Sequence, residues 1–578
     1  MTRRPWPVRL AVSAAILGLL ISGCSTVPTA SAPVAITQVS GGVDEPVGVE
    51  PLSPESGASP EEIVRGFIES SASTVQGRPV SREYLTAQQA ETWDDTASIT
   101  VIEPELSAVT SGPDTVVRVT GQLVGTVDRA GIFTPQIDEF SIELRMVQEN
   151  EQWRIAGPTT GIYITRTDFV SAYEQRDIYF LDGTSRFVVP DPRFFVRAGR
   201  VQSTQLVERL LTGPSPWLGP AVDNQLADME LASSVLVTGR RARVELIQEQ
   251  ESSNEALEGL SAQLAYTLLG QLSIQSLEVT INGTALQLPG VGPVQELSDW
   301  RSFDPDAAAS AVTGVGHYID AGAVRTEDGN PIPGPAGTQA YGLSSAAVRI
   351  EEDSGELLTL AGLAVTGQSA TLYVGPYGGE LTAVLNDARL TAPTWSGVAE
   401  EVWTVRNGSD VVRIPTGSPV QAVPAPELAG TGAVRIFQLS RDGSRAALII
   451  ETATGPALFI ARIERNEDTI TVRAPLAIAP SLSGVTDVSW TSADSLIVLA
   501  TEPGGEQVVP YTIGVDGWGI SELTTDGLPG EPDAVAAAPN RAYLVSAGGS
   551  VWQFSPEVWA VLIRGQAPLP GTAPFYPS

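Results

Sequence analysis

Apolar residues follow two different periods in the first part of the chain. Near the start they recur at the three- and four-residue spacing of one helix face, at Ile63, Val64, Phe67 and Ile68. Ser59-Pro60-Glu61-Glu62, just before them, contains the residue types that cap and begin a helix. Over residues 115–127 and 140–146 the period changes to two, which is typical of strands buried on one face. These segments predict an α+β domain over residues 59–165.

A helix followed by long antiparallel strands resembles the cone-shaped NTF2-like fold, at the level of the fold only. Enzymes with that fold often hold an aspartate and a histidine inside the cone. Residues 59–165 contain no histidine. We therefore expect packed side chains, rather than a substrate, to fill the cone.

Residues 167–289 form a second predicted unit, the middle domain. A short strand is expected at residues 177–181, and the helix after it ends at Gly213-Pro214. A longer helix carries four leucines on one stripe, Leu257, Leu260, Leu264 and Leu268. Asn282-Gly283, after an alternating stretch, predicts a tight hairpin. The middle domain is therefore also expected to be α+β.

The rest of the chain has little helical pattern and many turn residues. A unit of two apolar strands recurs every 45 to 50 residues, beginning near Ser345, Trp395, Ser440, Trp490 and Pro539. This period fits a four-stranded propeller blade, which buries its faces only against neighbouring blades in a closed ring. We predict an all-β propeller over residues 344–566, a linker or propeller start over 290–343, and a tail over 567–578. Five blades are recognisable, and residues 314–325 could supply another.

The N-terminus has the three parts of an export signal. Three arginines precede an apolar run over residues 10–21, which is shorter than the roughly 20 residues needed to span a bilayer. Ile21-Ser22-Gly23-Cys24 then resembles a lipobox, where bacteria attach lipid to a cysteine and cleave before it. Lipidation would also explain why the only cysteine of an exported chain is unpaired. We predict a signal peptide over residues 1–23, lipidation at Cys24, and a flexible tether over residues 24–58.

The charge of the chain limits its partners. All 34 basic residues are arginine, against 67 acidic residues, and the formal net charge is −33. Such a surface is repelled by nucleic acid and by anionic lipid. We therefore expect no nucleic-acid partner, and contact with the membrane only through the lipid on Cys24.

Few side chains are arranged for chemistry. The only histidine, His317, has no Gly-x-Ser-x-Gly elbow near it, and we expect an exposed or hydrogen-bonded linker residue. One histidine is too few for a zinc site. Asp304 and Asp306 could bind calcium, and two of the many carboxylates could serve a glycosidase. Most acidic residues, however, lie in polar runs such as the one that contains Glu149 and Glu151, for which solvated surface is the ordinary interpretation. We predict no catalytic residue, no metal and no cofactor.

With these segments laid out, the chain resembles the actinobacterial LpqB lipoproteins over almost its whole mature length. The resemblance is carried by the order and spacing of short stretches at residues 177–182, 188–193, 210–215, 390–395, 440–443 and 510–517. The stretch around Tyr179 is similar to the GerM-type domain, first named from spore-germination proteins. The resemblance implies an N-terminal domain, a GerM-type domain and a propeller on a lipid anchor.

The same resemblance implies a role beside the MtrAB two-component system, where the lipoprotein contacts the extracytoplasmic part of the sensor histidine kinase. We therefore expect a non-enzymatic accessory regulator of such a kinase and of envelope homeostasis, anchored at the extracytoplasmic face of the cell membrane. The alternative class is a cell-wall glycan-binding protein or a carboxylate-dependent glycan hydrolase, with acidic residues in a cone or propeller pocket.

Substitution of Cys24 tests the lipid anchor. Cys24→Ala removes the sulfur that would accept lipid, and we expect an unlipidated precursor that still carries the signal peptide. Mass spectrometry of the purified chain measures both changes. A mature, acylated Cys24→Ala protein would leave an ordinary cleavable signal with an incidental cysteine as the explanation.

Overall fold

The computed structural model describes residues 51–103, 107–111, 116–157, 160–197, 202–307, 315–351, 354–466 and 469–578. All of them belong to one compact unit, Pro46–Ser578. The predicted signal peptide, Cys24 and most of the predicted tether lie outside the described residues.

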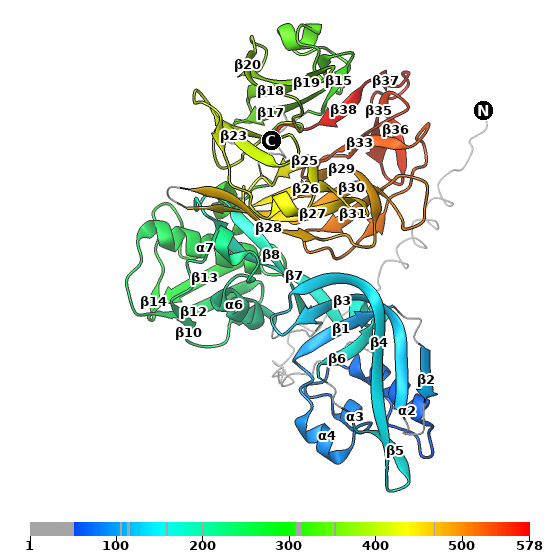
Figure 1. Cartoon of the computed structure of the whole chain (residues 1–578). Helices are drawn as coiled ribbons and strands as arrows, with labels where there is room; N and C mark the ends of the chain where they lie inside the picture. The colour runs from blue at the N-terminus through cyan, green and yellow to red at the C-terminus, as the bar shows by residue number, and fades with distance from the viewer. Residues whose placement is uncertain are drawn as a thin grey trace, which may run out of the picture. The chain divides into compact units, whose positions relative to one another are not determined.

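The N-terminal domain is α+β, as predicted. Its helices are α2 (Pro60–Ser71), α3 (Pro79–Arg82), α4 (Ala87–Thr92) and α5 (Arg166–Ala172). Its strands are β1 (Ser98–Ile102), β2 (Ser107–Ser111), β3 (Val116–Asp128), β4 (Phe133–Glu149), β5 (Gln152–Ile155) and β6 (Ile162–Thr165). They form one sheet in the order β5-β4-β3-β1-β6, with β2 also paired to β3 (Figure 1).

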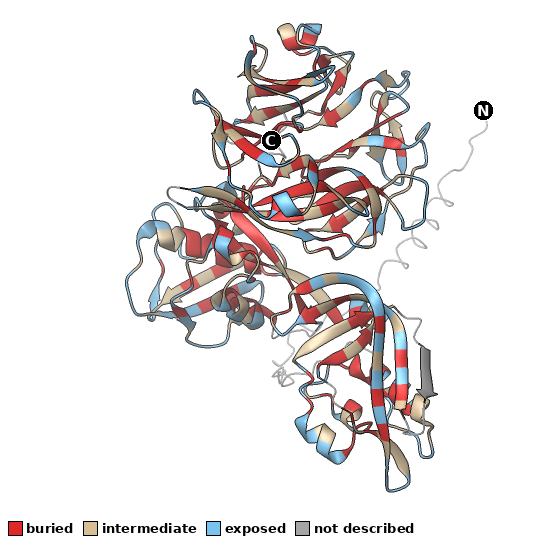
Figure 2. Cartoon of the chain, viewed as in Figure 1, coloured by how far each residue is buried: buried red, intermediate tan, exposed pale blue. Residues whose placement is uncertain are grey.

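The sequence pattern explains why this domain packs as it does. The Ser59 hydroxyl accepts a hydrogen bond from the Glu62 amide, and the Glu62 carboxylate accepts one from the Ser59 amide. These two bonds form a capping box at the start of α2. The predicted apolar face of α2 is buried against the sheet, in one cluster with Trp93, Phe140 and Leu144. Figure 2 shows buried and exposed positions following one another along β4. The NTF2-like cone itself stays a prediction.

The middle domain contains two small sheets and two long helices. One sheet has the order β8-β7-β9, from β7 (Tyr173–Asp182), β8 (Val188–Val196) and β9 (Val222–Asp223). The other has the order β10-β12-β13-β14, with β11 also paired to β12, from β10 (Met229–Leu231), β11 (Leu236–Thr238), β12 (Arg241–Gln248), β13 (Ser276–Ile281) and β14 (Thr284–Ala285). The helices are α6 (Gln202–Thr212), α7 (Asn254–Leu268) and the short η1 (Gly219–Ala221) and η2 (Leu297–Phe303). The Asn282-Gly283 hairpin is confirmed between β13 and β14, and both residues have positive φ angles of 52° and 76°.

Side chains of α7, and of Gln271 just after it, form hydrogen bonds with backbone groups on one edge of β7. The Thr267 hydroxyl accepts a hydrogen bond from the Tyr179 amide at 3.1 Å, and the Gln263 side-chain amide donates to the Tyr179 carbonyl at 3.1 Å. The Gln271 side chain bonds both backbone groups of Asp177. Gln263 and Thr267 are buried and Gln271 is partly buried, and together they satisfy backbone groups that would otherwise lie unpaired.

The C-terminal region is a ring of six sheets in the described residues. The first has the order β16-β15-β38, from β15 (His317–Asp320), β16 (Ala323–Thr326) and β38 (Thr572–Phe575). The next two are β17 (Ser345–Ile350), β18 (Leu357–Thr366), β19 (Ser369–Pro376) and β20 (Thr382–Asp387), then β21 (Thr394–Trp395), β22 (Glu401–Arg406), β23 (Asp410–Pro415) and β24 (Gln421–Ala422).

The remaining three sheets follow the same plan. They are β25 (Ala433–Leu439), β26 (Arg445–Thr452), β27 (Gly455–Arg465) and β28 (Ile470–Ala477); β29 (Ser483–Ser492), β30 (Ser495–Thr501), β31 (Val509–Gly514) and β32 (Ser521–Glu522); and β33 (Pro532–Ala536), β34 (Leu544–Ala547), β35 (Ser550–Ser555) and β36 (Val558–Val561), with β37 (Leu569–Pro570) paired to β35. Each strand is antiparallel to the one before it within its sheet, which is the arrangement of propeller blades.

The last strand of the chain closes the ring. The innermost strands β17, β21, β25, β29, β33 and β38 each contact the next, and β38 contacts β17 again. Residues 567–578 were predicted as a tail, but they contain β37 and β38, and β38 pairs with β15 from the predicted linker. The described part of residues 314–325, which could have added a blade, therefore supplies β15 and most of β16 in the first of the six sheets.

Repeated side-chain bonds join neighbouring blades. The indole of Trp395 donates to the Ala347 carbonyl of the preceding blade at 3.2 Å, and the indole of Trp490 donates to the Gln438 carbonyl at 3.2 Å. Both tryptophans begin a repeat that the sequence period identified. The period therefore reports contacts between blades as well as strands within them.

An aromatic cluster joins the propeller to both preceding domains. Trp518, in the loop after β31, packs edge-on against Phe133 of β4, Phe169 of α5 and Phe194 of β8, with ring centroids 4.9, 5.2 and 5.2 Å away. The guanidinium of Arg166 lies 5.6 Å from the Trp518 ring centre. Edge-to-face pairs of this kind add to the free energy gained by burying the rings.

Truncation of Trp518 tests this contact. Trp518→Ala removes the ring that all three phenylalanines share, and we expect a loss of about 3 kcal/mol in unfolding free energy. Cleavage by trypsin between the N-terminal domain and the rest should also become faster. Trp552→Ala, a partly buried tryptophan within one propeller sheet, is the control. Equal acceleration of that cleavage in both variants would contradict a specific role for Trp518.

Candidate functional site

A buried charged network lies where the middle domain meets the propeller. Asp191 and Arg193, both on β8, form a two-bond ion pair at 2.9 and 2.8 Å, and their exposed fractions are 4% and 3%. The Asp191 carboxylate also accepts a hydrogen bond from the Ser215 amide at 2.7 Å. Burial of two charges is tolerated because each charge is paired and hydrogen-bonded.

The propeller contributes a third buried charge to this network. Arg445, at the start of β26 and 2% exposed, donates across the junction to the Pro190 carbonyl. The turn before it is tightened by Asp442, which accepts from the Ser440 hydroxyl and the Ser444 amide at 2.8 Å each. Burial raises the pKa of Asp442 above its ordinary value. The Ser440-Arg441-Asp442-Gly443 turn thus positions an arginine at the contact between domains.

Three further contacts cross the same junction. The Trp217 indole donates to the Ala474 carbonyl at 2.9 Å, and Arg462 donates to the Trp217 carbonyl at 2.9 Å. Gln175 of β7 donates to the Asp516 carboxylate at 2.6 Å. Each bond joins a middle-domain residue to a propeller strand or loop, so the junction is specified by geometry as well as by apolar contact.

Several carboxyl groups near this junction have raised pKa values. Burial, followed by the charges of Asp494 and Asp516, raises the pKa of Asp177 to about 8. Burial also raises the pKa of Asp306 to about 7 and that of Asp516 to about 6. These groups become charged near neutral pH, where their mutual repulsion opposes close contact of the domains.

The candidate residues from the sequence have structural partners. His317 is fully buried in β15, is bonded to the Tyr377 hydroxyl at 2.9 Å and stacks on Phe575 of β38. It is therefore hydrogen-bonded, as expected, but within a propeller sheet rather than a linker. Burial lowers the pKa of His317 to about 4, which keeps the ring neutral. Asp306 accepts from the Ala493 amide at 3.1 Å, and Asp304 accepts from the Asp306 amide.

The described residues contain neither a metal-binding cluster nor a membrane-spanning helix. No three histidine, cysteine, aspartate or glutamate side chains there are grouped so that they could hold a metal ion. Among the helices in the same residues, none is long and apolar enough to cross a bilayer.

The propeller surrounds a cavity of about 250 Å³ on its axis. All six innermost strands contribute to its lining, including Ala346, Thr394, Gln438, Asp487 and Phe575. Asp487 accepts bonds from the Val535 and Val488 amides, so its carboxylate serves the contact between two blades. These polar groups bond neighbouring strands to one another. We therefore attribute the cavity to the closure of the ring.

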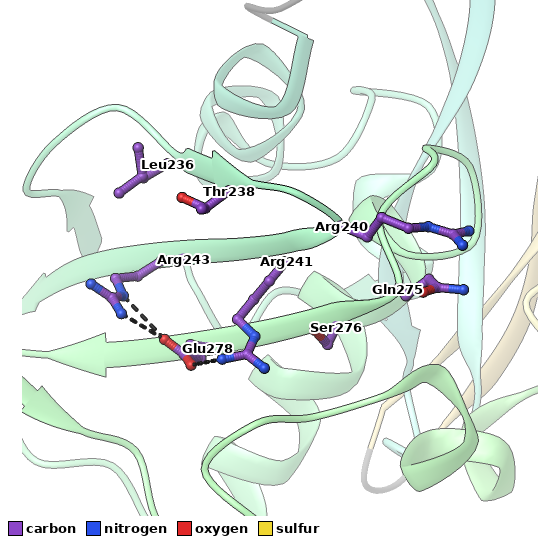
Figure 3. A pocket seen from close by; sticks show the side chains of 8 residues that line it. All are labelled: Leu236, Thr238, Arg240, Arg241, Arg243, Gln275, Ser276 and Glu278. Carbon is purple, nitrogen blue, oxygen red and sulfur yellow. Dashed lines mark hydrogen bonds and ion pairs between the residues drawn. The ribbon is translucent and has the colours of Figure 1, made fainter. Parts of the chain in front are cut away.

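A second cavity, of about 420 Å³, opens on the middle domain and is called the arginine pocket. It is lined by Leu236, Thr238, Arg240, Arg241, Arg243, Gln275, Ser276 and Glu278, as Figure 3 shows. The residues come from β11, β12, the turn between these strands, and the start of β13. Leu236 faces Arg243, and Thr238 faces Arg241, across the antiparallel pair. Their side chains therefore share the solvent face of this sheet.

One carboxylate in the arginine pocket holds two guanidiniums. Glu278 accepts from Arg241 at 2.9 Å and from Arg243 at 3.1 and 2.9 Å, as the dashed lines in Figure 3 mark. The hydrogen bond from Arg243 is the main reason that the pKa of Glu278 lies below its ordinary value. Arg241 and Arg243 remain about half exposed, with exposed side-chain fractions of 51% and 50%. The pocket can thus bind further anionic groups.

Sequence reasoning missed the arginine pocket, although a signal was present. Arg240, Arg241 and Arg243 lie within four positions of a chain that has 34 basic residues among 578. The stretches that carry the family resemblance map elsewhere, because Asp177, Asp191, Arg193, Asp442 and Asp516 all lie in or beside the buried junction.

Comparison with known families gives three consecutive matches. The N-terminal domain model described as "Lipoprotein LpqB, N-terminal domain" matches residues 53–170. The model described as "Sporulation and spore germination" matches residues 177–287, and "Lipoprotein LpqB beta-propeller domain" matches residues 322–577. The last match runs through β38, in agreement with the closure of the ring by that strand.

Individual proteins show the same similarity. Lipoprotein LpqB of Mycobacterium tuberculosis is 28% identical, over 96% of this chain and 98% of its own. Lipoprotein LpqB of Mycolicibacterium smegmatis is 29% identical, over 96% of this chain and 99% of its own. Among solved structures, the tandem GerMN domains of the sporulation protein GerM from Bacillus subtilis share 18% identity, cover 21% of this chain and 46% of that chain, and give a TM-score of 0.17.

The raised pKa of Asp177 predicts how stability changes with pH. The folded chain keeps this proton up to about pH 8, whereas the unfolded chain releases it near pH 4. Stability from this group is therefore complete at low pH and is lost as the pH rises toward 8. Relative to Asp177→Asn, the wild-type unfolding free energy should fall between pH 5 and 8, by up to about 1.4 kcal/mol per unit.

Denaturant unfolding of both chains at several pH values measures this difference. Asp228→Asn, which changes an exposed aspartate of the same domain, should keep the wild-type pH dependence. A wild-type curve parallel to that of Asp177→Asn would show that Asp177 titrates as an ordinary carboxyl group.

Proposed function

Because the chain belongs to the LpqB family of lipoproteins, we propose that it is a non-enzymatic scaffold, held by lipid on Cys24 at the extracytoplasmic face of the cell membrane. Its partner in this proposal is the extracytoplasmic domain of a sensor histidine kinase of the MtrAB type. By binding that domain the scaffold influences kinase signalling and envelope homeostasis.

The observation that carries this proposal is the buried polar junction between the middle domain and the propeller. Asp191 and Arg193 form a buried ion pair on β8 of the middle domain, Asp442 holds the turn before β26, and Arg445 donates across the junction to the Pro190 carbonyl. A chain whose buried polar contacts set the relative placement of two domains suits a protein that presents surfaces to a partner. A binding surface needs preorganised shape more than a reactive group.

Lipid attachment supports the same proposal. A propeller and a GerM-type domain tethered to the bilayer meet membrane proteins at high effective concentration, because diffusion is confined to one surface. Two or more acyl chains make such anchoring stable. The acidic surface, with a formal net charge of −33, gives little attraction to anionic lipid and leaves the lipid as the main hold.

Direct binding is the test of this function. The mature chain and the purified outer domain of the kinase encoded in the same genome should form a complex, measured by co-purification and by calorimetry. We expect a dissociation constant in the micromolar range or below, since both partners share one membrane surface. The absence of binding at high micromolar concentration would remove the claim of direct contact.

A further inference from the structure

The arginine pocket differs in charge from the rest of the chain. Arg240, Arg241 and Arg243 are opposed by one carboxylate, Glu278, so the pocket is positive within a chain whose formal net charge is −33. Charges on an exposed sheet face attract groups of opposite sign and set which partner approaches in which orientation. The local field of this pocket therefore selects an anionic ligand.

The same sheet also presents apolar side chains to solvent. Leu236, Val237 and Ile247 have exposed fractions of 57%, 40% and 46%. All three lie on β11 or β12: Leu236 and Ile247 are on the arginine side of the sheet, with Leu236 directly opposite Arg243, and Val237 is on the other side. Exposed apolar residues that gather next to a charged pocket are typical of interaction surfaces, since single exposed residues are normally scattered.

Strand β11 has a free edge. Within the described residues, β11 pairs with β12 and with no other strand. Its outer backbone groups are therefore available to an extended segment of another chain, which would add one strand to the sheet. Side chains of the added strand would alternate between the arginine side and the opposite side of the sheet.

Glu278 shows what kind of group the arginines bind. Its two oxygens are held by Arg241 and Arg243 at 2.9 to 3.1 Å, which is the geometry of a guanidinium with a carboxylate. Among the described residues, the guanidinium of Arg240 has one long hydrogen bond, at 3.4 Å, to the Ser273 carbonyl. A carboxylate from a second chain would meet Arg240 and the exposed sides of the other two arginines.

From these features we propose that the arginine pocket binds an extended, acidic segment of a partner protein, whose carboxylates pair with Arg240, Arg241 and Arg243 while its backbone lies along β11. The inference rests on the proposed function, because it assigns this pocket as the contact surface for the kinase's outer domain. A peptide fits better than a bilayer, because the arginines line a pocket and a free strand edge recognises backbone amides, which lipid headgroups lack.

Charge reversal in the pocket tests the assignment. Arg241→Glu combined with Arg243→Glu should weaken binding of the kinase outer domain at least tenfold, an effect on the order of that for one close charge pair. Arg118→Glu is the matched control, since Arg118 is also a strand arginine paired to a glutamate, with an exposed fraction of 52%. The control should bind as the wild type does.

Glu278→Gln should change the affinity for the kinase outer domain in the opposite direction. It removes the internal carboxylate that competes for Arg241 and Arg243, and we expect binding that is about three- to fivefold tighter and more sensitive to salt. Misfolding cannot cause a gain in affinity, so this variant still tests the inference if the double variant is unstable. Unchanged or weaker binding by Glu278→Gln overturns the inference.

The remaining outcomes separate the inference from the proposed function. If the wild type binds the outer domain and the double variant binds it equally, the function stands and the pocket is not the contact surface. Equal weakening by Arg118→Glu also overturns the assignment. If the wild type does not bind the outer domain, the function fails, and a synthetic peptide of alternating glutamate and valine then tests the pocket alone.

For that peptide, fluorescence anisotropy with the mature chain should show binding that the double variant loses. A peptide with lysine in place of glutamate should not bind. Equal binding of both peptides overturns the inference. So does binding of the unlipidated chain to phosphatidylglycerol vesicles that depends on Arg241 and Arg243, because the pocket would then recognise lipid.

Discussion

The buried pairing of Asp191 with Arg193, together with Arg445, is the constraint on which the arrangement of the described domains depends. Removal of water from a charge is costly, and the loss of one partner from a buried pair typically costs about 3 to 5 kcal/mol. Asp191 avoids that cost through two arginine bonds and the Ser215 amide. Arg445 adds a bond from the propeller to the Pro190 carbonyl in the adjoining backbone. The pair orders β8 within the middle domain, and the bond from Arg445 then joins that strand to the propeller.

Closure of the propeller ring is the second condition for this junction. Arg445 begins β26, and its position depends on the blades on either side of that strand. Blades are bound to one another by bonds such as that of Trp490 to the Gln438 carbonyl, and the ring is completed when β38 pairs with β15. His317 of β15 and Phe575 of β38 stack at that closure. The junction leaves the opposite, arginine-rich sheet face of the middle domain open to solvent.

Local sequence signals predicted the elements well and long-range contacts poorly. The helix cap at Ser59 and the hairpin at Asn282-Gly283 depend on neighbouring residues alone, so the sequence contains all the information needed. Strand β38 pairs with a strand at the other end of the propeller, and nothing in residues 572–575 indicates that partner. Trp518 likewise acquires its role only from phenylalanines in three other segments. The sequence shows the three arginines of the pocket close together, but it does not show that they share one sheet face beside the free edge of β11.

The central claim is that the middle domain presents the arginine pocket to the partner. Hydrogen–deuterium exchange of the mature chain, alone and with the kinase outer domain, tests this claim most directly, because backbone amides report contact without any substitution. The account predicts slower exchange in β11 and β12 on binding, with β3 and β4 of the N-terminal domain unchanged. Protection confined to the strands around the propeller cavity, with β11 and β12 unaffected, would contradict it.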